Sequence, residues 1–193
     1  MIIGLGFALL LLQSCHHSSE KKVDAPPPPV ETKDSPAFFP VTDYIKGQIR
    51  EITEKQVNPI KYVTVKGHTD SSWLKMEELP AAFDDFLHPE IDSMNLISLF
   101  KETKFMDQSI NAFTFTYDPI ATLPDSMHLE HWDLYIDPAT GKVKRVYMVK
   151  NAGEGRTKQL TWQGDRWCKI VDIISKADGT SAVEKEVKIT WEF

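Results

Sequence analysis

The sequence predicts an α+β domain in which two N-terminal helices pack on a largely antiparallel sheet that ends in a five-strand meander. Two patterns carry this prediction. In two segments before residue 90, apolar residues recur every three to four positions, which is the period of an amphipathic helix. After residue 128, short runs of alternating apolar and polar residues are separated by turns that contain glycine, which is typical of antiparallel strands.

The first helix is expected between residues 44 and 56. Three isoleucines share one face of this segment: Ile45, Ile49 and Ile52. Thr42 or Asp43 is the expected N-cap, because a short side chain with an oxygen atom can accept a backbone N–H of the first turn. A strand rich in β-branched residues follows at 60–66 and stops at Gly67.

The second helix is expected between residues 73 and 87. Four apolar residues form one stripe along it: Met76, Leu79, Phe83 and Phe86. Its other face is acidic, with Glu77, Glu78, Asp84 and Asp85. Two more strands are expected near 99–106 and 111–117.

The remaining chain predicts the meander. Its five strands are expected at about 130–136, 142–150, 156–162, 166–175 and 182–192. Successive strands joined by short turns must pair antiparallel, and the first of these turns predicts a left-handed Gly141 after a type I turn. The strand at 166–174 is apolar on both faces, so it is either covered on both sides or curved around a cavity.

Charge and cysteine content limit the possible functions. The chain has 193 residues and a formal net charge of −6, which argues against nucleic acid as a partner. It has two cysteines, Cys15 and Cys168. Cys168 lies in a predicted strand, where a buried apolar role is expected.

The N-terminus carries the most specific motif. Residues 2–12 are an uncharged apolar run that is too short to span a bilayer of about 30 Å. The residues that follow, Leu12-Gln13-Ser14-Cys15, resemble the lipobox of bacterial lipoproteins. The resemblance implies a signal peptide at 1–14, cleavage before Cys15, and acyl chains such as palmitate that anchor Cys15 in the lipid bilayer. It also implies a place in the cell envelope. His16, rather than Asp, follows the cysteine, which implies the outer membrane, with the domain in the periplasm or at the surface.

Residues 15–40 are expected to be a disordered tether that begins at the lipidated cysteine. Six of the twelve prolines fall in this segment, and it offers few apolar side chains that could offset the entropy of ordering. A single domain is therefore expected at 41–193.

A cluster of basic residues is the candidate site for an anionic partner. Its members are Lys142, Lys144, Arg145, Lys150, Arg156 and Lys158, and only Glu154 opposes them in this segment. An anionic envelope component or an acidic protein surface would complement such a cluster. Two alternatives stay open: a solvated sheet face, and pairing with the acidic second helix.

The sequence indicates no catalytic or cofactor motif. His128, Glu130, His131 and Asp133 are potential metal ligands, but alternation along a strand places the first two and the last two on opposite faces. Four tryptophans lie in the meander: Trp132, Trp162, Trp167 and Trp191. They are expected in the core, and exposure on a sheet face would instead favour a platform for stacking sugar rings.

These observations predict a membrane-anchored envelope lipoprotein with a non-enzymatic binding or accessory domain. No metal, other cofactor or nucleic acid is expected. The alternative is a carrier of a lipid or another apolar ligand, motivated by the two-sided strand at 166–174. A hydrolase or metal enzyme around residues 128–133 is a weaker alternative, because it requires those side chains to converge.

Overall fold

The computed structural model describes residues 38–92, 96–124 and 126–193. All of them belong to one compact unit, Ser35–Phe193. The predicted signal peptide, the lipidated Cys15 and the tether up to residue 37 lie outside the described residues. Among the helices that the structure describes, none is long and apolar enough to cross a membrane.

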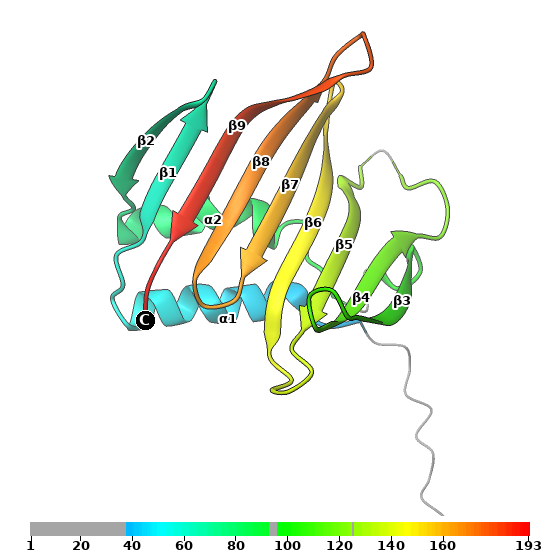
Figure 1. Cartoon of the computed structure of the whole chain (residues 1–193), viewed down its shortest axis with the longest axis horizontal. Helices are drawn as coiled ribbons and strands as arrows, with labels where there is room; N and C mark the ends of the chain where they lie inside the picture. The colour runs from blue at the N-terminus through cyan, green and yellow to red at the C-terminus, as the bar shows by residue number, and fades with distance from the viewer. Residues whose placement is uncertain (1–37, 93–95, 125) are drawn as a thin grey trace, which may run out of the picture. The chain divides into compact units, whose positions relative to one another are not determined.

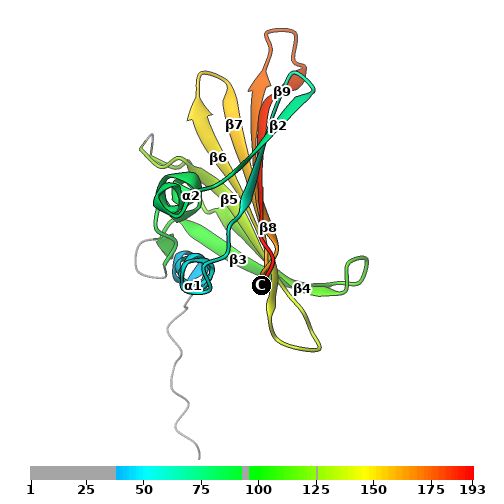
Figure 2. The ribbon, with the colours of Figure 1, turned by 90° about the vertical axis from the view of Figure 1, so that its left-hand side faces the viewer.

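The described residues form one nine-stranded antiparallel sheet with both α-helices on the same face (Figures 1 and 2). The helices are α1 (Val41–Glu54) and α2 (Leu79–Leu87), and the 3-10 helix η1 (Met76–Glu78) leads into α2. The strands are β1 (Ile60–Val65), β2 (His68–Trp73), β3 (Phe100–Asp107), β4 (Ala112–Pro119), β5 (Leu129–Ile136), β6 (Val143–Gly153), β7 (Arg156–Gln163), β8 (Trp167–Ser175) and β9 (Ser181–Thr190). Their order across the sheet is β2-β1-β9-β8-β7-β6-β5-β4-β3. Strands β3 to β9 therefore make one continuous meander, and the β1–β2 hairpin extends the sheet beside β9.

The predicted α+β class is wrong, because the described chain is largely β. Its two α-helices have only 14 and 9 residues. They are also not a pair of successive N-terminal helices, since the β1–β2 hairpin lies between them. The sequence does not predict β2 because all six of its residues are exposed, and an edge strand without a buried face shows no apolar alternation. Trp73, expected to begin the second helix, instead ends β2.

The five strands expected after residue 128 correspond to β5–β9, and each pairs antiparallel with the next. Gly141 adopts the expected left-handed conformation, with φ +67°, and its N–H donates to the carbonyl of Asp137 at 2.8 Å. The sequence therefore predicts two features correctly. Alternating apolar residues indicate strands with one buried face, and a glycine in a turn indicates a positive φ.

The expected N-cap of the first helix is wrong. Helix α1 begins at Val41 with Pro40 at the cap position and no side-chain cap. Thr42 lies within the first turn and is buried. Its hydroxyl oxygen accepts the backbone N–H of Ile91 at 2.7 Å, so it joins α1 to the segment after α2.

Two groups of aromatic rings fill the space between the helices and the sheet. In the first, Phe83 and Phe86 of α2 contact Trp162 at centroid distances of 5.3 and 5.2 Å, and Trp191 lies 5.2 Å from Trp162. Ring pairs of this geometry contribute about 0.5–1.5 kcal/mol each beyond the burial of their area. This group fixes α2 on the centre of the sheet.

The second group lies next to Phe38, the first residue that the structure describes. Trp132 stacks on Tyr117 at 4.5 Å and meets Phe100 edge-on at 4.7 Å. Phe38 joins them, 5.0 Å from Tyr117. Phe38 falls in the segment expected to be tether, but it is buried, so the packed domain includes it.

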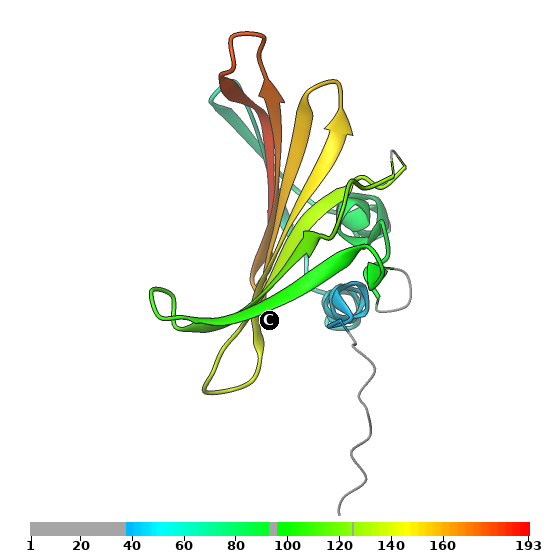
Figure 3. The same ribbon diagram turned by 90° about the vertical axis from the view of Figure 1, so that its right-hand side faces the viewer.

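The strand at 166–174 is covered on one side. Cys168 and Ile170 are buried on the face that carries the helices. The alternate residues Trp167, Val171 and Ile173 lie on the other face and are only half-buried. Neither α-helix of the described chain lies on that second face (Figures 2 and 3), which we call the open face.

Candidate functional site: an aromatic groove on the open face

A groove of about 910 Å³ lies at one end of the open face. Four strands supply its floor, β2, β1, β9 and β8, and the adjoining segments 57–58, 165–166 and 191–193 complete its lining. Six of its lining residues bear on function: Tyr62, Trp73, Asp165, Arg166, Trp167 and Thr190. The groove therefore combines aromatic rings with hydrogen-bonding and charged groups, a composition found in ligand sites.

The strand register places two indole rings in one row across the sheet. Trp73 pairs with Ile60, Ile60 pairs with Thr190, and Thr190 pairs with Trp167. Paired residues of an antiparallel ladder project to the same face. Because neighbouring strands lie about 4.8 Å apart, the backbones of Trp73 and Trp167 are about 14 Å apart. Ile60 and Thr190 form the floor between them.

The two rings differ in exposure. Trp73 is 68% exposed, the largest value among the exposed large apolar side chains of the described chain. Trp167 is half-buried, and the ammonium of Lys188 lies 5.3 Å from its ring centroid. A cation above an aromatic face is an attractive contact. Lys188 therefore helps to hold the Trp167 ring in place.

One rim of the groove carries charges of both signs. Asp165 and Arg166 lie in the turn before β8, and Glu192 follows β9. The backbone N–H of Trp191 donates to the carbonyl of Arg166 at 3.0 Å, which fixes this turn to the end of β9.

Comparisons of the chain with models of protein families, with curated proteins and with solved structures found no match. Function is therefore inferred from the residues.

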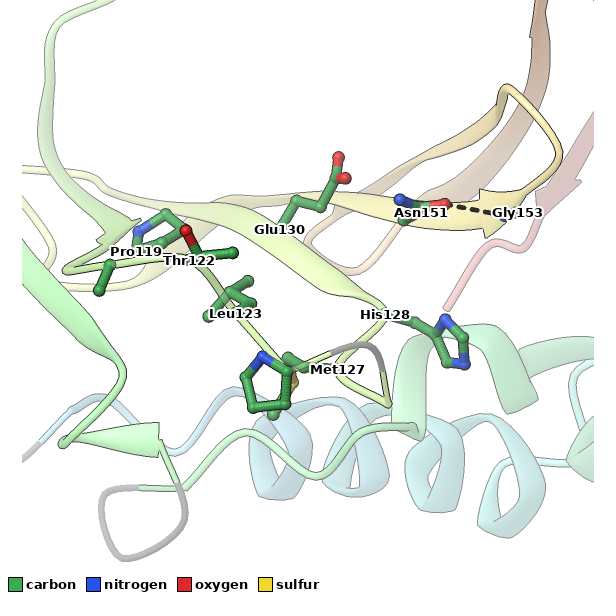
Figure 4. Close-up of a pocket in the computed structure, with 10 residues that line it drawn as sticks. Pro119, Thr122, Leu123, Met127, His128, Glu130, Asn151 and Gly153 are labelled. Atoms are coloured by element: carbon green, nitrogen blue, oxygen red, sulfur yellow. Dashed lines mark hydrogen bonds between the residues drawn. The ribbon is translucent and has the colours of Figure 1, made fainter.

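The potential metal ligands at residues 128–133 are split between two places. His131 and Asp133 lie on the open face, where the Nε2 atom of His131 is 3.2 Å from Asp133 and its Nδ1 atom is 2.8 Å from Asp118. His128 and Glu130 instead line a cleft of about 500 Å³ beside the loop before β5, and they point in different directions (Figure 4). Within the described residues, no group of three or more His, Cys, Asp or Glu side chains is arranged to hold a metal ion.

The His131–Asp133 pair makes stability depend on pH. The hydrogen bond to Asp133 raises the pKa of His131. Burial opposes ionisation of Asp133, but hydrogen bonds from His131 and Thr116 outweigh it and lower the pKa of Asp133. The contribution of His131 to the unfolding free energy is complete below its ordinary pKa and is lost as pH rises through the raised value. The contribution of Asp133 is lost as pH falls through the lowered value.

We expect His131→Gln to reduce the unfolding free energy more at pH 5.5 than at pH 8.5. Urea titrations of both proteins at the two pH values measure this, and an equal loss at both would contradict it.

The basic candidate residues are not brought together into one patch. Lys158 binds both carboxylate oxygens of Asp85, at 2.7 and 3.0 Å. Its cross-strand partner Lys150 is buried and donates to the backbone carbonyls of Asp85 and His88 at the end of α2. The second helix is thus the intramolecular counterpart of these two lysines.

The other four basic residues lie towards the strand ends. Arg156 forms ion pairs with Glu154 and Glu184, each at 3.0 Å. Arg145 lies 4.1 Å from the ring centroid of Tyr135. Lys144 donates to the carbonyls of Ile110 and Asn111 at 3.0 and 3.3 Å, and Lys142 is exposed in the β5–β6 turn. Lys142, Lys144 and Arg145 are therefore the part of the candidate set that shares one end of a hairpin.

Sequence reasoning did not find the groove. Of the four tryptophans in the meander, Trp132, Trp162 and Trp191 are in the core, as expected, and Trp167 alone lies on the open face. The sequence pattern places the second ring, Trp73, at the start of the helix expected at 73–87. No signal in the sequence around Trp73 indicates the strand, because a strand that is exposed on both faces shows no apolar alternation.

Proposed function

We propose that this chain is a lipid-anchored protein of the bacterial cell envelope whose domain binds a ligand in the aromatic groove. The observation that carries the binding role is the row from Trp73 to Trp167, with one indole two-thirds exposed on a sheet face that bears no helix in the described chain. Contiguous exposed apolar surface with a polar rim marks interaction sites. The anchor rests on the resemblance of residues 12–15 to a lipobox.

The anchor and the groove support the same role. Each buried CH₂ group of an acyl chain contributes about 0.8 kcal/mol, so the two or more chains expected on Cys15 hold a protein stably at a bilayer. His16 favours the outer membrane, with the domain in the periplasm or at the surface. The lining of the groove offers rings, hydroxyls and a guanidinium, which are groups that hold and orient a ligand. The role proposed is therefore binding rather than catalysis.

Replacing Cys15 with alanine tests the anchor. Without the sulfur there is no site for the diacylglycerol, so we expect Cys15→Ala to move the protein from the membrane pellet to the soluble fraction. Fractionation after labelling with palmitate measures both location and acylation. Cys168→Ala is the matched control, because the thiol of Cys168 is buried in the core, and it should stay in the pellet. A Cys15→Ala protein that remains in the membrane would remove the anchor from the proposal.

The groove is tested separately with the soluble Cys15→Ala protein. A detergent-free extract of the cell envelope is added to protein that carries the NMR-active nitrogen isotope, and the indole N–H signals are followed by NMR. We expect the signals of Trp73 and Trp167 to shift while that of the buried Trp132 does not. Shifts confined to other signals, or none at all, would count against a ligand in the groove.

Two alternative binding roles of the domain stay predictions. Lys142, Lys144 and Arg145 could contact an anionic envelope component, since they share one hairpin end. A carrier of an apolar ligand would need space beneath the helices, where Trp162 and Trp132 are packed against other rings. The groove offers its surface without any displacement of the helices, and we therefore favour it.

A further inference from the structure

We infer that the ligand of the groove is a glycan, a chain of uncharged pyranose sugars whose ring faces stack on Trp73 and Trp167. The inference rests on the proposed function, since it names the chemistry of the ligand at the same site. Three features of the groove lead to it: the spacing of the rings, the character of the floor and the balance of charge.

The spacing of the rings fits a ligand with repeated flat faces. A compact apolar ligand is usually held in one enclosed apolar pocket. Here two indoles project from β2 and β8, about 14 Å apart along a row of four strands. A pyranose chain offers an apolar C–H face on each sugar and so can meet both rings at once.

The floor between the rings is only partly apolar. Ile60 contributes an apolar surface, whereas Thr190 places a hydroxyl group beside Trp167. Tyr62, one row further along the same face, adds a second hydroxyl group and lies opposite Lys188. Sugars present hydroxyls around the edge of each ring, so a floor with scattered hydroxyls can replace their contacts with water, while a purely apolar ligand would leave these groups without partners.

The charges around the groove balance. Asp165 and Glu192 carry negative charge, while Arg166 and the nearby Lys188 carry positive charge. Lys55, whose ammonium lies over the ring of the lining residue Phe193, is already paired with Glu51. A polyanion would be repelled by the first pair and a polycation by the second. An uncharged sugar can instead use the carboxylates as acceptors and the guanidinium as a donor, which are the stronger hydrogen-bonding groups. The balance favours an uncharged glycan over an acidic one.

The half-buried ring is already positioned for stacking. The ammonium of Lys188 lies over Trp167, and the end of β9 fixes the turn that precedes this residue. A ring held before binding loses less rotational freedom when the ligand arrives. By this argument Trp167, which is half-buried and contacts Lys188, is the more restrained of the two platforms.

The test titrates the full-length Cys15→Ala protein with two uncharged hexasaccharides, the N-acetylglucosamine hexamer and cellohexaose. Isothermal titration calorimetry measures the binding. We expect at least one of them to bind. Trp73→Ala and Trp167→Ala should each weaken binding about tenfold, the equivalent of about 1.4 kcal/mol, and Trp73→Phe should keep most of it because a stacking ring remains.

Phe105→Ala is the matched control. Phe105 is 49% exposed and lies on the same face at the opposite edge of the sheet, on β3. Its loss should change binding less than twofold. Thermal melting of each variant shows whether the fold is intact, and Trp73→Ala should melt like the unchanged protein because this side chain is exposed.

The inference is overturned if neither uncharged hexasaccharide binds, if both alanine variants leave binding unchanged, or if a hexamer of galacturonate, which is anionic, binds more strongly. If envelope extract still shifts the Trp73 and Trp167 signals while neither uncharged hexasaccharide binds, the glycan inference fails and the proposed binding role stands. If the protein forms a dimer that Trp73→Ala abolishes, the groove is occupied by a second copy of the chain and the inference is also wrong.

Discussion

Replacing Trp162 with alanine is expected to lower the free energy of unfolding by about 3–5 kcal/mol. Trp162 is fully buried, and Phe83, Phe86 and Trp191 all pack against its ring. The substitution removes the ring on which Phe83 and Phe86 of α2 pack, and it leaves a cavity that the neighbouring rings can fill only in part. The indole nitrogen has no hydrogen-bond partner among the described residues, so the loss is one of packing. Urea unfolding followed by circular dichroism measures it.

Trp73→Ala makes the same chemical change on the surface and is the control. Because Trp73 is 68% exposed, its replacement should change the unfolding free energy by no more than about 0.5 kcal/mol. Similar losses for Trp73→Ala and Trp162→Ala would contradict the assignment of one ring to the core and the other to the open face.

The contrast between these two tryptophans shows what the sequence could predict. Strands β5 to β9 alternate in burial and are joined by short turns, so local pattern is enough to place them and to place Trp162 inside. Strand β2 has no buried face, so nothing in His68–Trp73 indicates a strand until its partner β1 is known. The error in fold class follows from this one hairpin, together with the shortness of α2.

The partners of the basic residues also cannot be predicted from the local sequence pattern. Lys158 pairs with Asp85, 73 positions earlier in the chain, and Lys150 reaches the end of the same helix. The acidic face of α2 and the basic strands β6 and β7 could be recognised separately. Only the sheet order and the position of α2 decide that they meet, and that some of the candidate residues are therefore already engaged.

Lys150 is expected to make the domain more stable as pH rises from 8 to 10. Burial lowers the pKa of Lys150 to about 8; the nearby carboxylate of Asp85 acts in the opposite direction, and the charge of Lys158 adds to the lowering. Above pH 8 the folded chain loses this proton, while the unfolded chain keeps it up to about pH 10.4. Stability rises with pH wherever the unfolded state binds more protons. The gain is about 2 kcal/mol between pH 8 and 10.

The carbonyls at the end of α2 keep their donor through this titration, because a neutral amine still has two N–H groups for Asp85 and His88. Lys150→Met removes both the donor and the titration, so its unfolding free energy should lack the rise. Urea unfolding at half-unit pH steps gives the difference in unfolding free energy between the unchanged chain and Lys150→Met. This difference separates the titration of Lys150 from the titration of the tyrosines. Burial raises the pKa of Tyr44 to about 12, and such groups reduce stability above pH 10. Lys142→Met removes an exposed charge and is the control. A Lys150→Met protein that follows the pH dependence of the unchanged chain would mean that the buried ammonium stays charged in the fold.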